Sequence, residues 1–287
     1  MEFRAYPTGP ELAPYVRMLW TVQGSAEEAA GSGAQCIPPD GCMEIILHVG
    51  GTVEETRDDG AVRVQPRALL VGENRRPSCV RPLGPVDFVG VRLTPAGVRA
   101  FFDAPAHELV DNTFSLESVL DAKTQTDIAS VVSAEPGERL HLLEEALVRK
   151  IRRGRRHDPL VARMVMRMEA SEGTRVAIEA LANDAGLTRR QLERRFLDAV
   201  GMSPKTLVQV LRFQRVLGVL ADASPRWVDV AAACGYYDQA HLNRDFKRFT
   251  GATPRSFLGR DHPFADLFRP DGSRDVASVQ SVAALAV

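Results

Sequence analysis

Cysteine is scarce in this chain of 287 residues, and its spacing excludes two common architectures. The four cysteines, Cys36, Cys42, Cys79 and Cys234, form no CxxC pair. Zinc ribbons use such pairs, and a disulfide scaffold uses cysteine at a much higher density. We therefore predict four reduced cysteines that serve as small core residues, and no metal site.

Long apolar runs and secretion signals are missing as well. The chain lacks a run of about 18 apolar residues, which excludes a membrane-spanning helix. Its N-terminal segment lacks the basic and then apolar order of a signal peptide. We therefore expect a cytoplasmic protein without a membrane partner.

Catalytic sequence motifs are absent too. None of GxSxG, HExxH, GxGxxG and GxxxxGKS/T occurs in a suitable context. The paired carboxylates Glu144-Glu145 and Asp58-Asp59 are adjacent in sequence, so their side chains diverge on a helix or lie in a turn. The sequence thus predicts a protein that is not an enzyme, with no catalytic residues and no cofactor.

The sequence does contain enough apolar residues for a core, and its charge is unevenly distributed. Hydrophobic residues make up 45% and charged residues 25%, which excludes intrinsic disorder as the main character. Residues 171–260 hold 14 Lys or Arg and 9 Asp or Glu, a net charge of +5. All other residues hold 22 and 28, a net charge of −6. A basic segment on an acidic majority indicates one part that faces a polyanion and one part with another task.

The N-terminal third predicts short strands. Apolar and β-branched runs at 15–22, 43–49, 68–71 and 86–93 are separated by Gly, Pro, Asp and Asn, which is typical of a small sandwich or barrel. The last run has two faces, formed by Val86, Phe88 and Gly90 and by Asp87, Val89, Val91 and Leu93.

Beyond Pro95 the apolar period becomes helical. Amphipathic helices are predicted over 116–132, 139–151 and 158–170. The second helix runs into a segment, 149–156, in which six of eight residues are basic. This segment is either a solvated helix end before a linker or an auxiliary contact with DNA phosphates.

An internal repeat at 178–196 and 227–246 is the strongest pattern in the chain. The copies match at an offset of 49 up to a turn, as in Gly186 and Gly235, and at an offset of 50 beyond it. Each copy predicts two helices around a glycine turn, and Ala182 and Ala231 allow the helices to cross closely. This is the pattern of a helix-turn-helix unit, whose second helix enters the major groove of DNA.

Helical phase divides each second helix into a buried and an exposed face. The buried faces consist of Leu192, Phe196 and Ala199 and of Leu242, Phe246 and Phe249. The exposed faces carry the candidate DNA contacts, which are Arg189, Arg190, Glu193 and Arg194 in the first helix and Gln239, His241, Asn243, Arg244 and Lys247 in the second. Arg or Lys pairs with guanine, and Asn or Gln with adenine, at about 1–3 kcal/mol of discrimination per good pair. A solvated face of a helical bundle is the alternative, which the repetition in register disfavours.

A single helix over 204–220 is predicted between the two units. Pro204 suits its first turn, and Leu207, Val210, Leu211, Leu217 and Leu220 give it an apolar stripe. At 1.5 Å per residue it measures about 25 Å, whereas successive major grooves lie about 34 Å apart. One chain could therefore place two recognition helices on one face of DNA.

These repeats resemble the DNA-binding domain of AraC/XylS-type transcription regulators. The matching strings are GLTRRQLERRF at 186–196, GMSP at 201–204, ACGYYDQAHL at 233–242, DF at 245–246 and GATPRSF at 251–257. The resemblance implies double-stranded DNA and RNA polymerase as partners. It also implies contacts with bases or adjacent phosphates at Arg190, Glu193, Arg194, Gln239, His241 and Arg244. Ala240 departs from the family pattern, because its small side chain offers at most a contact with a thymine methyl group.

The N-terminal strings IPPDGCME at 37–44, LVG at 70–72 and VGVRLTPAG at 89–97 resemble the N-terminal domain of an AraC-type subgroup. In the wider family this part is a β-rich sensing or dimerising domain. The resemblance therefore implies a small-molecule effector and a homodimer. Candidate ligand contacts are Trp20, Asp40, Glu44 and Arg92. Asp40 also fits a turn before Gly41, and Arg92 fits an ion pair at a strand edge.

Two alternatives stay open for the N-terminal part. Cys36, Cys42 and Cys79, together with His48, could support thiol oxidation or metal sensing. An enzyme fused to a DNA-binding domain is the other alternative.

The sequence thus predicts an α+β chain with a β-rich N-terminal sandwich or barrel-like domain, a helical connector and an all-α C-terminal domain of two helix-turn-helix units. Its parts are a sensor domain at 1–104, a connector and dimerisation region at 105–170, a DNA-binding domain at 171–260 and a weakly patterned tail at 261–287. We expect two recognition helices to read adjacent major-groove segments. Effector binding would change the geometry of the dimer or of the DNA-binding units.

Overall fold

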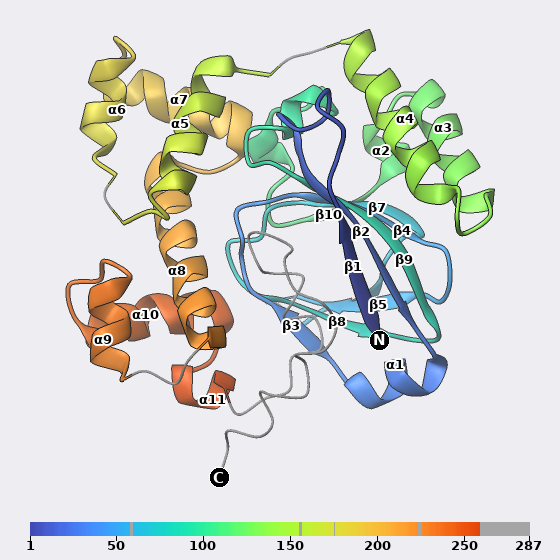
Figure 1. Cartoon of the computed structure of the whole chain (residues 1–287), viewed down its shortest axis with the longest axis horizontal. Coiled ribbons are helices and arrows are strands. Elements are labelled where there is room, and N and C mark those ends of the chain that lie inside the picture. Colours follow the sequence, from blue (N-terminus) through green and yellow to red (C-terminus); the bar gives the residue numbers. More distant parts are fainter. Residues whose placement is uncertain (58–59, 155–156, 175, 223–225, 259–287) are drawn as a thin grey trace.

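In the computed structural model the chain forms a β-rich N-terminal part and an all-helical C-terminal part (Figure 1). The structure describes residues 1–57, 60–154, 157–174, 176–222 and 226–258. The pair Asp58-Asp59 and the tail expected at 261–287 lie outside these residues. The α+β architecture predicted from the sequence is confirmed.

Two antiparallel sheets face each other in the N-terminal part. The larger sheet has the order β1-β2-β9-β4-β7-β10, and the smaller sheet the order β3-β8-β5-β6. The strands of the larger sheet are β1 (Glu2–Tyr6), β2 (Val16–Gly24), β9 (Val86–Leu93), β4 (Glu44–His48), β7 (Ala68–Val71) and β10 (Thr113–Ser115). Those of the smaller sheet are β3 (Gln35–Ile37), β8 (Ser78–Pro82), β5 (Val53–Thr56) and β6 (Val62–Val64), and the short helix α1 (Ala26–Ser32) follows β2.

Strand β9 shows how the larger sheet is buried on both faces. Val89 and Val91 belong to the core beneath the helices, whereas Phe88 belongs to the core between the sheets, as the alternation predicts. Gly90 lies opposite Trp20 of β2. A Cβ atom at Gly90 would come within 2.0 Å of Cε2 of the Trp20 ring, so the indole occupies the space that a side chain at this position would need.

Helices cover the outer face of the larger sheet. Two 3₁₀ turns, η1 (Val98–Ala100) and η2 (Ala106–Glu108), lead to α2 (Leu116–Val119), α3 (Ala122–Ser133) and α4 (Arg139–Arg153). Ile128, Leu143 and Leu147 pack with the strands in one core. The single helix predicted over 116–132 is interrupted because Asp121 caps α3, its carboxylate accepting a hydrogen bond from the amide of Thr124 at 3.0 Å.

The C-terminal part consists of α5 (Pro159–Ala170), α6 (Ile178–Asp184), α7 (Arg189–Val200), α8 (Pro204–Asp222), α9 (Trp227–Ala233), α10 (Gln239–Thr250) and α11 (Pro254–Leu258). One hydrophobic core joins α5, α6 and α7 to the first half of α8, and another joins α9, α10 and α11 to its second half. With 19 residues, α8 is about 28 Å long. The described helices include none that is both long and apolar enough to cross a bilayer.

The first helix-turn-helix unit packs directly on the N-terminal part. Helix α7 contacts η1 and η2, and Asp198 of α7 lies 3.6 Å from the guanidinium of Arg99. Ala96 belongs to the same core as Phe196. The segment expected as a connector, 105–170, therefore divides, because α2 to α4 cover the sheet while α5 packs with α7.

Candidate DNA-binding surface and ligand cavity

Both repeats form helix-turn-helix units, α6–α7 and α9–α10, stacked along α8 (Figure 1). Gly186 and Gly235 have φ values of 64° and 72°, in the left-handed region that favours glycine. Thr188 begins α7 with a reciprocal pair of hydrogen bonds to Gln191, and Asp238 begins α10 by accepting one from the amide of His241. The turn and the helix starts are therefore fixed by local sequence.

The predicted buried and exposed faces of α7 are confirmed. Leu192 and Phe196 are fully buried, whereas Arg190 and Arg194 are exposed and form no ion pair with any described residue. Arg189 behaves differently, because its guanidinium lies 3.2 Å from Glu179 of α6 and 3.0 Å from Glu193. Two of the four candidate DNA contacts of α7 thus have partners within the unit, and two do not.

Helix α10 shows the same division. Gln239, Arg244 and Lys247 are exposed, and within the described chain they have no ion-pair partner. Asn243 is half-buried. The ring of His241 packs edge-on against Tyr236, 5.1 Å between centroids, and its Nε2 atom lies 3.8 Å from Asp245. These contacts hold His241 against its own unit.

A groove of about 520 Å³ joins the two units along α8. It brings Arg189 and Glu193 of the first unit together with His241 of the second. Lys205, Gln209 and Arg212 of α8 also line it. These three residues were not among the sequence candidates, although they lie on the polar side of the predicted apolar stripe.

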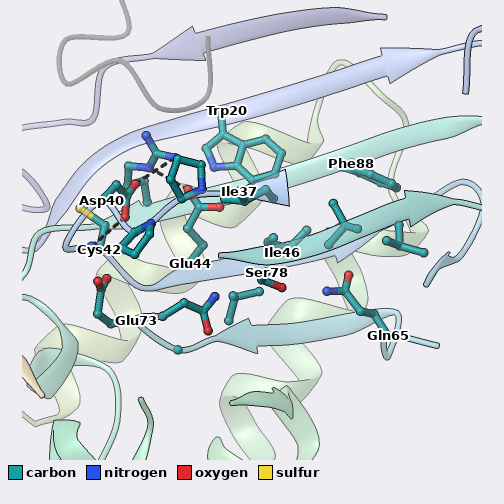
Figure 2. A pocket seen from close by; sticks show the side chains of 18 of the residues that line it. Trp20, Ile37, Asp40, Cys42, Glu44, Ile46, Gln65, Glu73, Ser78 and Phe88 are labelled. Atoms are coloured by element: carbon teal, nitrogen blue, oxygen red, sulfur yellow. Dashed lines mark hydrogen bonds and ion pairs between the residues drawn. The ribbon is translucent and has the colours of Figure 1, made fainter. Parts of the chain in front are cut away.

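The four predicted ligand contacts meet in one cavity between the two sheets (Figure 2). The Arg92 guanidinium lies 2.7 Å from Glu44 and 3.3 Å from Asp40, in an ion-pair network at the centre of the larger sheet rather than at its edge. Asp40 also accepts a hydrogen bond from the amide of Cys42, as a turn residue does. Trp20 forms part of the wall.

Sequence reasoning missed two polar residues of this cavity as ligand contacts. Both carboxylate oxygens of Glu73 and the Nδ1 atom of His48 are buried without a hydrogen-bond partner among the described residues. Burial raises the pKa of Glu73 well above its usual range and lowers the pKa of His48 to about 4. Glu73 directly follows the family-like string at 70–72, and this position is the sequence feature that could have identified it as a candidate ligand contact.

One wall of the cavity also contacts the DNA-binding part. Pro39 and Asp40 line the cavity, and the Pro39 carbonyl accepts a hydrogen bond of 2.6 Å from Nε2 of Gln214 in α8. Gly41 packs so closely on Leu207 of α8 that an added Cβ would lie 3.1 Å from its Cδ1 atom. The loop that closes the cavity is therefore also the loop that contacts the helix joining both units.

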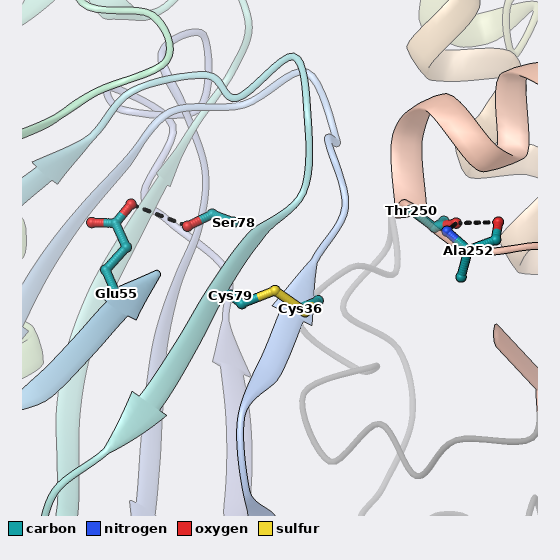
Figure 3. The surroundings of a disulfide bond; sticks show 6 residues. All are labelled: Cys36, Glu55, Ser78, Cys79, Thr250 and Ala252. Atoms are coloured by element: carbon teal, nitrogen blue, oxygen red, sulfur yellow. Dashed lines mark hydrogen bonds between the residues drawn. A yellow bond between two sulfur atoms is a disulfide. The ribbon is translucent and has the colours of Figure 1, made fainter. Parts of the chain in front are cut away.

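The expectation of four reduced cysteines is wrong for two of them. Cys36 and Cys79 lie opposite each other on β3 and β8 and form a disulfide (Figure 3). Their separation of 43 residues gave no indication of this cross-strand register. Cys42 and Cys234 are buried thiols, and burial raises both pKa values. No cluster of metal-binding side chains occurs within the described ranges.

The basic segment 149–156 is largely neutralised by the N-terminal part. Arg149 and Arg153 pair with Asp127, Lys150 pairs with Asp121, and Arg152 pairs with Glu11. Arg155 and Arg156 lie outside the described residues. The four described cations thus hold α4 to neighbouring elements, which favours the interpretation as a structural helix end.

Comparisons with known proteins match both parts of the chain. A model of the helix-turn-helix domain matches residues 181–260, and a model of a domain of unknown function (DUF6597) matches residues 4–115. The chain is 29% identical over 124 residues to the HTH-type transcriptional regulator ArgR of Pseudomonas aeruginosa. This match covers 39% of this chain and only 38% of that protein.

Solved structures give similar matches. An AraC-type DNA-binding domain-containing regulator from Chromobacterium violaceum is 30% identical and covers 34% of this chain and 88% of that chain, with a TM-score of 0.32. ToxT from Vibrio cholerae is 9% identical over 90% of this chain and 98% of that chain, with a TM-score of 0.47.

Proposed function

Because the chain belongs to the AraC/XylS-type family of helix-turn-helix transcription regulators, we propose that it regulates transcription by binding a specific DNA sequence. The exposed, unpaired arginines repeated on α7 and α10 carry this proposal. Both recognition helices are attached to the rigid helix α8, so they enter adjacent major-groove segments together.

Arg194 and Arg244 are the base-contacting residues in this proposal. Both are exposed in the middle of a recognition helix and form no ion pair with a described residue, so no such pair must break when DNA binds. A guanidinium pairs bidentately with guanine. Lys247 and Arg190 bind phosphates, while Arg189, held by two carboxylates, contributes less.

The cavity between the sheets is the proposed effector site. Pro39 and Asp40 line it, and Gln214 and Leu207 of α8 contact Pro39 and Gly41 of the same loop. A ligand that changes this loop changes the packing of α8, and with it the placement of both units. A ligand controls DNA binding only to the extent that it binds the two arrangements with different affinity.

Fluorescence anisotropy with duplexes tiled from the upstream region of the gene, against scrambled duplexes at two salt concentrations, tests the DNA-binding function. We expect a preference of about 10³-fold for one duplex and a steep loss of affinity with salt. Arg194→Ala and Arg244→Ala should each cost about 1–3 kcal/mol and relax the preference at one base pair. Arg152→Ala is the matched control, because Arg152 pairs with Glu11 in the N-terminal part. Uniform weakening on all sequences would make the residue a phosphate contact instead.

The disulfide supports a second candidate function, a response to oxidants. Its formation from two thiols delivers two electrons and two protons to an oxidant such as a peroxide. Thr250 and Ala252, at the end of α10, are among its surroundings (Figure 3), and Pro77 packs near Gly251. A change at this bond could therefore reach the second unit. Equal DNA affinity before and after reduction, in wild type and in a Cys36→Ser, Cys79→Ser variant, would refute this function.

A further inference from the structure

The cavity between the sheets contains three buried polar groups that form no hydrogen bond of normal geometry with the described residues. They are the carboxylate of Glu73, the indole N–H of Trp20 and the Nδ1 atom of His48, in residues that are 1%, 2% and 1% exposed. Buried polar groups in native proteins are nearly always hydrogen-bonded, and unpaired ones are costly. Three such groups in one cavity indicate a ligand that supplies the missing partners.

Glu55 shows that the fold does satisfy a buried carboxylate where no ligand is needed. It belongs to the smaller sheet and is 3% exposed. Its oxygens accept hydrogen bonds from the hydroxyls of Ser78 and Thr113, at 3.1 and 2.8 Å, and one lies 3.1 Å from the guanidinium of Arg57. Glu73 is more deeply buried and has none of these partners; the backbone amide of Gly41 lies near its carboxyl group but forms no hydrogen bond of normal geometry with it.

The charges around the cavity determine what the ligand is. Its one arginine, Arg92, is already paired with Asp40 and Glu44. The nearby Arg17 is paired with Glu169 of α5. Glu73 is thus a third carboxyl beside a cation that has two already. Arg67, whose charge acts on His48, does not line the cavity, so an anionic ligand would find no unpaired cation among the described lining residues and would face Glu73.

The walls fit the rest of such a ligand. Trp20 and Phe88 are aromatic, and Val22, Ile46 and Val80 are aliphatic. Aromatic faces attract cations, and a dry apolar wall strengthens that attraction. The cavity of about 100 Å³ has room for roughly seven to ten water-sized groups, which limits the ligand to a small molecule.

We propose that this cavity binds a small organic cation, with an ammonium or amidinium group donating hydrogen bonds to Glu73 and an apolar body between Trp20 and Phe88. The inference rests on the proposed function, in which this cavity is the effector site. Figure 2 shows the Glu73 carboxyl directed towards the end of the cavity where Asp40 and Cys42 lie. Burial and the neighbouring Asp40 raise the pKa of Glu73, and a bound cation offsets this cost by favouring the carboxylate.

The fluorescence of Trp20 reports binding without DNA. The chain has two tryptophans, and Trp227→Phe leaves Trp20 as the single emitter. The probes are butylammonium, benzylammonium and benzamidinium, with benzyl alcohol as the neutral match and benzoate as the anionic match. We expect a saturable change in Trp20 emission with at least one cation, at an affinity at least tenfold above that of either match.

Two variants assign the binding to Glu73. Glu73→Gln keeps the shape but removes the charge, and should weaken cation binding at least tenfold. Glu54→Gln is the control, because Glu54 pairs with Arg81 in the smaller sheet and does not line the cavity. Circular dichroism verifies that both variants are folded. If a variant does not fold, the preference of the wild-type protein for the cations over benzyl alcohol and benzoate tests the proposal by itself.

Three results would overturn the inference. They are no saturable response to any of the cations, equal or tighter binding of benzyl alcohol or benzoate, or unchanged cation binding by folded Glu73→Gln. None of these depends on DNA. If one of these results is found while the protein still binds a specific DNA sequence, only the cation proposal is wrong. If the protein binds cations selectively but no specific DNA sequence, only the proposed DNA-binding function is wrong.

Discussion

Replacing Gly90 with alanine should displace either strand β9 of the larger sheet or the Trp20 side chain in the cavity wall. A Cβ atom at this position would lie 2.0, 2.1 and 2.6 Å from Cε2, Cζ2 and Cδ2 of Trp20. The strand cannot retreat easily, because β9 is paired with β2 on one side and β4 on the other. The indole is 2% exposed and must therefore leave its position between the sheets.

The expected cost follows from the number of close approaches. Overpacking of a well-packed core costs about 1–3 kcal/mol. Three ring carbons are affected and neither partner lies at a flexible chain end, so we expect about 3 kcal/mol of unfolding free energy to be lost. Trp20→Leu should cost a similar amount through the cavity that it leaves. In the double variant the second change removes the clash, so the combined loss should fall short of the sum by about 1–3 kcal/mol.

Urea unfolding followed by far-UV circular dichroism measures the unfolding free energies of wild type, the two single variants and the double variant, which together form a double-mutant cycle. For wild type and Gly90→Ala, which keep Trp20, its emission in the Trp227→Phe background reports the same transition from the N-terminal part alone. Gly90→Ala within about 0.5 kcal/mol of wild type, or additive losses in the double variant, would refute the proposed contact.

Three further predictions concern other parts of the chain. The pKa of buried His48 is about 4, against 6.5 in the unfolded chain, so the unfolded chain binds the proton first as pH falls. Unfolding free energy should therefore decrease between pH 6.5 and 4 by up to about 3 kcal/mol, and an identical urea profile for His48→Gln would contradict this. Pro204→Gly should loosen the start of α8 and lower DNA affinity by more free energy than it lowers stability, as anisotropy and urea unfolding can determine. Thiol titration of the unfolded, unreduced chain should find two thiols, from Cys42 and Cys234, and four after reduction; four before reduction would exclude the disulfide.

The helix-turn-helix units could be predicted from the sequence because their determinants are local. Gly186 and Gly235 fix the turns, and the spacing of Leu192 and Phe196 fixes which face of α7 is buried. Strands 68–71 and 86–93 were also predicted with the bounds that β7 and β9 have. Such patterns persist in the fold because tertiary packing agrees with them.

The rest depended on contacts between distant segments. Strands such as β3 and β6 have three residues each, too few for an alternating pattern to be recognised. Glu73 and Glu55 have the same side chain, and only the pairing of β5 with β8 and the position of Thr113 give Glu55 its partners. Likewise, the sequence allowed Arg92 to form an ion pair at a strand edge, and the order of the strands places this ion pair at the centre of the sheet.

The contact between the cavity loop and α8 also limits how strongly an effector can act. The Gln214–Pro39 hydrogen bond is neutral and buried, and a bond of this kind contributes about 0.5–1.5 kcal/mol net. Its loss alone changes an equilibrium between two arrangements by a factor of about two to thirteen. Stronger control requires that the packing of Gly41 on Leu207 change as well, which a movement of the whole loop would achieve. Asp40 links the cavity to α8 in this loop, because Arg92 holds it in the cavity while its neighbours on both sides contact α8. A cation bound at Glu73 would repel Arg92 and attract Asp40, whose charges both act on Glu73, and so would act on the loop at the residue that anchors it.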